Sequence, residues 1–334
     1  MNAGSSEPTL PRPAIGNTLL FIHRNRNRSS VIVVSGVSVA PRKSGSIPWH
    51  ADLISSHGRF VWYELTTPDV EAAKAFYANV VGWGTRDASA PMSAPMAYTL
   101  FTAGEESVGG LINLPEPARQ MGVRPHWIGY VCVNDVDAAA RRFKQLGGAV
   151  HVPPTDIPNV SRFSVVADSQ MATLILVKWQ DPGHQQSAAI DKPGHVGWHE
   201  LLAADWEKAL SFYREVFGWR KAETHIGPTG TYQLFSTAGQ TIGGMFNKPP
   251  VAPTAFWLYY FNVADVDAAA ERVSADGGQV LEGPTEIPGG RVARCTDPQG
   301  AIFALIGQQR HKTIGFFERT ESRGPDESGR QWSW

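Results

Sequence analysis

The chain has 334 residues, of which 30 are Lys or Arg and 31 are Asp or Glu, giving a formal net charge of −1. A composition of 42% hydrophobic and 18% charged residues is typical of a globular protein with room for roughly two domains. The balanced charge argues against a nucleic-acid partner, and the lack of an apolar run of about 20 residues argues against a membrane span.

Residues 1–55 differ from the rest of the chain. They are rich in Ser, Pro and Arg, and Glu7 and Asp52 are their only acidic residues. Their apolar stretch, VIVVSGVSVA, begins far from the first residue, whereas a secretory signal has its apolar core after a short basic start. We predict a disordered leader, which is either an organelle transit peptide or the result of a start codon assigned too early. The predicted location is cytoplasmic, or organellar or secreted if the leader is a targeting segment.

The first predicted domain, residues 57–180, opens with FVWYELTTPDVEAAKAFYANVVGW. Its aromatic-rich strand alternates apolar and polar side chains, and Asp69 can cap the helix that follows. Ala72, Phe76 and Val80 lie at helical spacing and are predicted to form a buried stripe. Short strands such as MAYTLFTAG and SVGGLINLP come next. The layout then returns as WIGYVCVNDVDAAARRF, so the predicted unit is βαβββ, used twice.

A polar linker at 181–193, which contains two Pro-Gly-type breakers, separates this domain from a second one at 194–310. The second domain repeats the first in the same order, about 130 residues later. VGWHELLAADWEKALSFYREVFGW repeats the opening stretch, IGGMFNKP repeats VGGLINLP, and ADVDAAAERV repeats NDVDAAARRF. Residues 318–334 are polar and are predicted to be a disordered tail.

Other motifs are scarce. The chain has only two cysteines, Cys132 and Cys295, each in an apolar strand-like run, and we expect both to be small buried hydrophobic residues. No phosphate-binding loop, nucleophile elbow or dinucleotide fingerprint is present, so neither NAD nor a flavin is expected.

The repeated βαβββ unit, with Phe-Tyr in the first helix and Gly-Trp after it, resembles the vicinal oxygen chelate superfamily. This superfamily includes glyoxalase I, bleomycin-resistance proteins and extradiol dioxygenases, and its tandem-domain, glyoxalase-like branch is the most similar. The resemblance implies an α+β fold of two domains, in which paired modules form a curved sheet around a cup. Because one chain carries all four modules, we expect a monomer or a weak homodimer.

The resemblance also implies a metal site, with ligands on the first and last strands of the modules. The aligned positions hold Trp62, Ile128, Ile175, Trp198, Leu258 and Ala304. None of these side chains is a metal ligand. We therefore expect no cofactor. A divalent metal remains the alternative, because a register shift of two residues would make Glu64 and Glu200 candidate ligands, with His126 in the first domain.

Alternation along the strands predicts which side chains face the cups. Those residues include Glu64 and Glu200, together with Trp62, His126, Tyr130, Trp198, Phe256 and Tyr260. An apolar wall with a few polar anchors suits a flat, hydrophobic small molecule. Desolvation beside Trp and Tyr would raise the pKa of Glu64 and Glu200, so both are candidate proton acceptors.

Arg162 and Arg291 are the predicted partners of the two glutamates, either as a structural ion pair or as ligand anchors. Three functions remain open. The first is metal-free binding of an apolar or aromatic molecule, of the sequestering kind. The second is an enzyme of the glyoxalase, dioxygenase or hydroxylase type that uses Glu64 and Glu200. The third is an interaction protein whose cups are filled by its own side chains.

Overall fold

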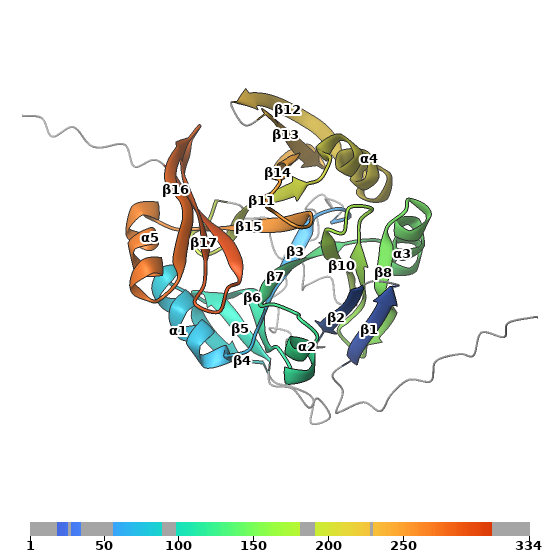
Figure 1. Cartoon of the computed structure of the whole chain (residues 1–334), viewed down its shortest axis with the longest axis horizontal. Coiled ribbons are helices and arrows are strands. Elements are labelled where there is room, and N and C mark those ends of the chain that lie inside the picture. The colour runs from blue at the N-terminus through green and yellow to red at the C-terminus, as the bar shows by residue number, and fades with distance from the viewer. Residues whose placement is uncertain are drawn as a thin grey trace, which may run out of the picture.

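A computed structural model describes the chain in six segments (Figure 1). These are residues 19–25, 28–34, 56–88, 98–180, 191–227 and 230–308. Within the predicted leader, β1 (Leu19–Asn25) and β2 (Arg28–Val34) pair as an antiparallel hairpin. The remainder of the leader, most of the predicted linker and the predicted tail lie outside the described residues.

The first domain is one eight-stranded sheet in the order β4-β5-β6-β3-β7-β10-β9-β8. Its two βαβββ units join through the antiparallel pair β3 and β7. The elements are β3 (Phe60–Thr67), α1 (Val70–Val80), β4 (Gly84–Asp87), β5 (Thr99–Ala103), β6 (Glu106–Asn113), α2 (Glu116–Gln120), β7 (His126–Cys132), α3 (Val136–Gln145), β8 (Ala149–Ile157), β9 (Ser161–Ala167) and β10 (Thr173–Trp179).

The second domain repeats this order as β12-β13-β14-β11-β15-β18-β17-β16. Its elements are β11 (Val196–Ala203), α4 (Trp206–Phe217), β12 (Arg220–Gly227), β13 (Gly230–Thr237), β14 (Gln240–Asn247), β15 (Phe256–Asn262), α5 (Val266–Ala275), β16 (Gln279–Ile287), β17 (Gly290–Thr296) and β18 (Ile302–Gln308). The predicted α+β fold of paired βαβββ modules is confirmed.

Each long helix begins at an aspartate whose carboxylate accepts the backbone N–H three residues on. Asp69 caps α1 in this way, as predicted, with its Oδ1 3.0 Å from the amide nitrogen of Ala72. The buried stripe of α1 contains Phe76 and Val80, but Ala72 is exposed and Ala73 is buried in its place. The prediction for Ala72 was therefore wrong by one position, because the stripe continues through Ala73.

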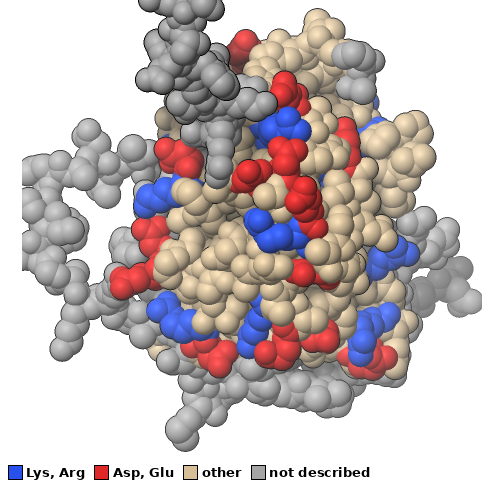
Figure 2. Space-filling model, turned by 90° about the vertical axis from the view of Figure 1, so that its left-hand side faces the viewer, with Lys and Arg blue, Asp and Glu red and all other residues tan. Residues whose placement is uncertain are grey.

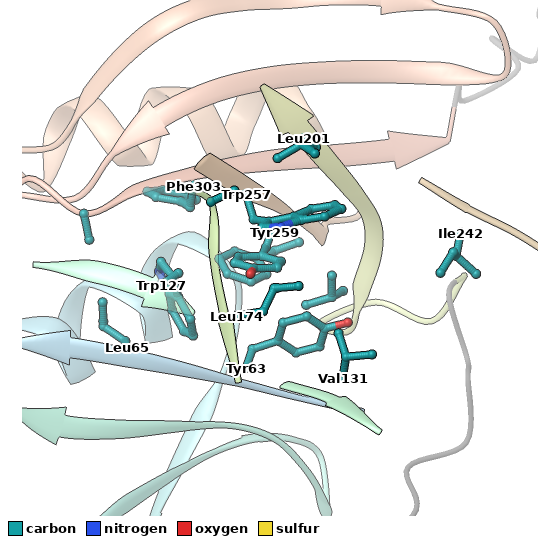
Figure 3. Close-up of a cluster of buried hydrophobic side chains, with 14 of the residues drawn as sticks. Tyr63, Leu65, Trp127, Val131, Leu174, Leu201, Ile242, Trp257, Tyr259 and Phe303 are labelled. Carbon is teal, nitrogen blue, oxygen red and sulfur yellow. The ribbon is translucent and has the colours of Figure 1, made fainter. Parts of the chain in front are cut away.

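The two domains pack back to back through their helix-bearing faces. α1 lies against α5, and α3 lies against α4 (Figure 1). The strand side chains that point toward the helices merge into one core, where Tyr63, Trp127, Trp257 and Tyr259 lie together (Figure 3). The opposite faces of the two sheets therefore point away from each other. We call the outward face of the first sheet the first cup and that of the second sheet the second cup.

The repeated motif supplies hydrogen bonds that join the two domains. The Tyr77 hydroxyl donates to Asp297 of the second domain at 3.2 Å, and the Tyr213 hydroxyl donates to Asp168 of the first at 2.9 Å. The tryptophan of each Gly-Trp pair likewise donates its indole N–H to a backbone carbonyl of the other domain, at 2.7 Å in both cases. One chain carries the same motif twice because each copy contacts the opposite domain.

We predict that replacing Tyr213 with Phe lowers the free energy of unfolding by about 1–2 kcal/mol, because buried Asp168 loses a donor. Urea unfolding would measure the change. Asn79→Ala is the matched control, since it removes an exposed hydrogen bond to Asp276 of the other domain and should cost less than about 0.5 kcal/mol. Equal losses of unfolding free energy in the two variants would contradict the view that the Tyr213 hydroxyl stabilises the contact between the domains.

No helix among the described residues is long and apolar enough to span a membrane. On the side that carries α1, α5 and β16, acidic and basic side chains are interspersed (Figure 2), in keeping with the near-zero net charge.

Candidate functional site

The first cup contains a chain of polar contacts within an apolar wall. The Trp62 indole N–H donates to the Tyr98 hydroxyl at 3.0 Å, and the Tyr130 hydroxyl donates to Glu64 Oε2 at 3.1 Å. Glu64 lies opposite Ile128 on the neighbouring strand. The structure thus brings together three of the residues predicted for this cup.

The second cup repeats the arrangement. The Trp198 indole N–H donates to the Tyr232 hydroxyl at 2.9 Å, and the Tyr260 hydroxyl donates to Glu200 Oε2 at 2.7 Å. Phe256 lies in the same cluster as Tyr260. The side chains predicted to line this cup from β11 and β15 therefore do so.

Sequence reasoning missed the two tyrosines that bind the tryptophans, Tyr98 and Tyr232. A signal was present in the glycine pairs of β6 and β14. A Cβ on Gly110 would lie 1.9 Å from the Tyr98 hydroxyl, and one on Gly244 would lie 2.3 Å from the Tyr232 ring. Each glycine leaves space for a tyrosine ring, which comes from the residue before β5 in the first domain and from β13 in the second.

The predicted partners of the glutamates were wrong in both domains. Arg162 binds Asp137, with nitrogen–oxygen distances of 2.7 and 2.9 Å, and Arg291 binds Asp267 at 2.9 Å. Both arginines therefore bind an aspartate in the first turn of the preceding helix, α3 or α5, rather than Glu64 or Glu200. Their side chains point to the helix-bearing face of the sheet and not to the cup, because neighbouring side chains on a strand point to opposite faces.

The arginine that binds Glu200 is Arg294, three residues after Arg291 and therefore on the cup face. Its Nη2 lies 2.8 Å from Glu200 Oε2, its Nε donates to the Tyr260 hydroxyl at 3.3 Å, and its Nη1 binds Glu282. The position equivalent to Arg294 in the first domain is Val165, which is buried in the wall of the first cup. Glu64 therefore has no cationic partner of this kind.

Glu64 is consequently a carboxyl group in an apolar site. Its side chain is 1% exposed, and burial raises its pKa to about 7, although its hydrogen bond from Tyr130 and the nearby Tyr98 hydroxyl partly offset this shift. Its Oε1 has no hydrogen-bond partner within the described part of the chain. The two glutamates thus occupy equivalent positions but differ in charge environment.

The cups also differ in how they are covered. In the first domain, α2 follows β6, buries Ala118 and packs into the apolar cluster of the cup, and the β1–β2 hairpin contacts both α2 and β8. In the second domain the corresponding segment, residues 248–255, forms turns, and Val251 is 89% exposed. Trp198, Tyr232 and Phe246 are half-buried, whereas their first-domain counterparts are buried. The second cup is the more open of the two.

The positions that the resemblance assigns to metal ligands lie on these cup faces. Ile128 and Ile175 belong to the wall of the first cup, and Leu258 and Ala304 to that of the second. Their hydrocarbon side chains offer no donor atom, so these residues do not fit a metal of that kind. Among the described residues, no three His, Cys, Asp or Glu side chains are grouped so that they could hold a metal ion.

His126, the remaining predicted residue of the first cup, is half-buried at the start of β7. Its Nδ1 lies 2.8 Å from the Arg124 carbonyl, and burial lowers its pKa. The imidazole is therefore neutral near pH 7 and donates from Nδ1 to that carbonyl. Among the described contacts, His126 forms no hydrogen bond with Glu64, which lies opposite Ile128, two residues further along β7.

Residues 59–176 and 192–305 match the Glyoxalase/Bleomycin resistance protein/Dioxygenase superfamily. The chain belongs to this superfamily. The two matched segments correspond to the two sheets, so both domains are members. The resemblance drawn from the repeated motifs is confirmed.

Two kinds of relative are similar over most of their length. "Putative glyoxylase CFP32" of Mycobacterium bovis is 35% identical over 246 residues, which are 73% of this chain and 93% of the relative. "Anthracycline biosynthesis protein DauV" of Streptomyces sp. (strain C5) is 30% identical over 272 residues, which are 75% of this chain and 93% of that protein.

Solved structures share the fold at low sequence identity. The 2,3-dioxygenase LapB from Pseudomonas sp. KL28 has a TM-score of 0.52 and 13% identity, covering 79% of this chain and 97% of that one. A variant of homoprotocatechuate 2,3-dioxygenase from B. fuscum also has a TM-score of 0.52, with 14% identity and coverage of 78% and 74%. At such identities the likeness shows the fold alone.

Proposed function

We propose that this protein binds an apolar or aromatic small molecule in its second cup, without a metal. The observation that carries the proposal is the partly exposed aromatic wall around the ion pair of buried Glu200 with partly exposed Arg294. Such walls, interrupted by a few fixed polar groups, are the usual form of small-molecule sites. The wall of the first cup is buried and α2 packs against it, so the more open second cup is the better candidate for binding a molecule of this kind.

The aromatic side chains of the second cup suit a flat ring. Trp198 and Tyr232 form a hydrogen-bonded pair on one side, and Phe246 and Phe256 lie on neighbouring strands. Relatives named for anthracycline biosynthesis are consistent with a ligand of the aromatic class. Binding without turnover, as in sequestration, requires no further group.

The test is calorimetric titration with 2-naphthol at pH 7. We predict saturable binding of one molecule per chain that is unchanged by EDTA. Trp198→Ala should weaken it at least about tenfold, the loss expected for one aromatic stacking contact. The control is Ile226→Ala, because Ile226 is 86% exposed but lies on the opposite face of the sheet from Tyr232. Absence of binding, or equal effects of the two substitutions, would refute the proposal.

A second candidate, proton transfer at Glu64, is favoured by one observation. Burial brings the pKa of this carboxyl to about 7, where it can both accept and release a proton at neutral pH. Its unpartnered Oε1 would be the reacting atom. The premise of this candidate is tested by the pH dependence of stability in a Glu64→Gln variant.

A further inference from the structure

Arg294 is a charged side chain of the second cup that is bound through its nitrogens and remains partly exposed. Glu200, Glu282 and the Tyr260 hydroxyl bind its nitrogens, and its side chain is 27% exposed. The guanidinium carbon lies over the Phe246 ring, 5.5 Å from the ring centroid. Because the guanidinium is planar and partly exposed, the surface that it offers to a ligand is flat and cationic.

We infer that the second cup takes an uncharged, electron-rich aromatic ring stacked on Arg294, and that it rejects anionic ligands of the same shape. The inference rests on the proposed function and adds the class of ligand. A guanidinium stacks well on electron-rich rings, because its charge is attracted to the negative face of the π system. Phe246, Arg294 and the ligand ring would then form three successive layers.

The surrounding charges explain the exclusion of anions. Arg294 lies between two carboxylates, Glu200 and Glu282, so this part of the cup carries a net negative charge. Three of the five guanidinium N–H donors of Arg294 are already used by Tyr260, Glu282 and Glu200. A ligand carboxylate placed here would meet like charge from the two glutamates and would compete with them for the same cation.

Two other ionisable groups must be weighed. The Lys248 ammonium donates to the Ala252 carbonyl at 2.5 Å, and this residue is four positions beyond Gly244, the partner of Glu200. Lys248 follows the last residue of β14 and is two positions beyond Phe246. His225 lies opposite Tyr232 on β12 and is exposed. In the described part of the chain, neither group forms an ion pair with Glu200 or Glu282, whose partner is Arg294.

The first cup supplies an internal comparison. Val165 stands where Arg294 stands in the second cup, and Ile112 stands where Phe246 stands. The stacked pair is therefore absent from the described first cup although the Trp–Tyr and Tyr–Glu hydrogen bonds are kept. The two cups therefore share their Trp–Tyr and Tyr–Glu hydrogen bonds and differ in the arginine and phenylalanine that would select a ligand.

The experiment compares 2-naphthol with 2-naphthoate, which has the same rings and a carboxylate, by calorimetry at pH 7. We expect 2-naphthol to bind at least about tenfold more tightly. Arg294→Lys keeps the charge next to Glu200 but removes the planar face, and should weaken 2-naphthol about fivefold or more. Glu282→Gln, at a 63% exposed side chain, should improve 2-naphthoate about fivefold and leave 2-naphthol unchanged.

The outcomes separate the inference from the proposed function. Failure of 2-naphthol to bind the second cup would refute the proposed function itself. Binding of 2-naphthol that is matched by 2-naphthoate, or that is unaffected by Arg294→Lys, would keep the proposed function and overturn the inference. A Glu282→Gln variant that leaves 2-naphthoate as weak as before would also overturn it.

Discussion

Replacing Glu64 with Gln is expected to stabilise the protein at pH 8 by about 3 kcal/mol relative to the wild type, and to leave stability nearly unchanged at pH 4. Burial raises the pKa of this carboxyl from 4.5 to about 7 in the folded protein. The folded state therefore holds a proton that the unfolded chain releases between these two pH values. The shift of about 2.5 pKa units corresponds to about 3 kcal/mol of stability.

The sign follows from proton binding. Below pH 4.5 the carboxyl is protonated in both states, and its full contribution to stability is present. As the pH rises toward 7, the unfolded state gains the free energy of ionisation first, so the wild type loses stability. Glutamine has no proton to lose and keeps the hydrogen bond from Tyr130. Urea denaturation of both proteins from pH 4 to pH 8 would measure the difference.

Glu200→Gln is the matched control, with the opposite sign. Glu200 is buried and ionically bonded to Arg294, so its removal leaves that arginine with Glu282 alone. We expect a loss of about 2 kcal/mol at pH 8, below the value for a fully buried pair because the Arg294 side chain is 27% exposed. If both substitutions changed the free energy of unfolding at pH 8 in the same direction, the proposed difference in charge between the two cups would be wrong.

The repeated motifs were sufficient to predict the frame of each cup. Alternation along β3 and β11 placed Trp62, Glu64, Trp198 and Glu200 on one face, because a strand has a period of two residues whatever its surroundings. Because of the same alternation, choosing a residue an odd number of positions away assigns the side chain to the wrong face of the sheet. Arg291 and Arg294 are three residues apart and lie on opposite faces, and no local signal in the sequence indicated which of them binds Glu200.

The repeated motifs could not predict which cup is covered by other segments of the chain. Whether a wall is buried depends on segments that are distant in sequence, such as α2 and the β1–β2 hairpin in the first domain. A duplication copies strands and helices, whereas connecting segments diverge freely. The sequence therefore left open whether one or both cups are functional, and the structure shows that the second cup is the more open of the two.

The domains also differ where they meet. Tyr63 and His199 are equivalent residues, and the Tyr63 hydroxyl lies 2.5 Å from His199 Nε2. Burial lowers the pKa of His199 to about 4, so the ring is neutral. Its Nδ1 donates to the Ile242 carbonyl, at 2.6 Å, and its Nε2 accepts from Tyr63. His199 therefore links the two domains through this hydrogen bond.

Gly129→Ala is expected to cost about 2–3 kcal/mol, because Gly129 leaves the space that Tyr259 of the other domain fills. The two residues are equivalent in the repeat, yet the Gly129 N–H donates to the Tyr259 hydroxyl at 2.7 Å. A Cβ on Gly129 would lie 2.7 Å from that hydroxyl and 2.9 Å from the Phe60 ring. Tyr259 is 1% exposed and cannot move aside without disturbing the shared core.

Two comparisons make this prediction specific to the interface between the domains. Gly227→Ala should change the free energy of unfolding by less than about 0.5 kcal/mol, since a Cβ there meets no atom within 4 Å. In a Tyr259→Leu background, Gly129→Ala should cost less than half as much as it does alone, because the two residues compete for one space. An undiminished cost would place the strain within the first domain. A reduced cost would show that Gly129 and Tyr259 share one space across the interface, so that the two halves of the repeat are complementary at this position.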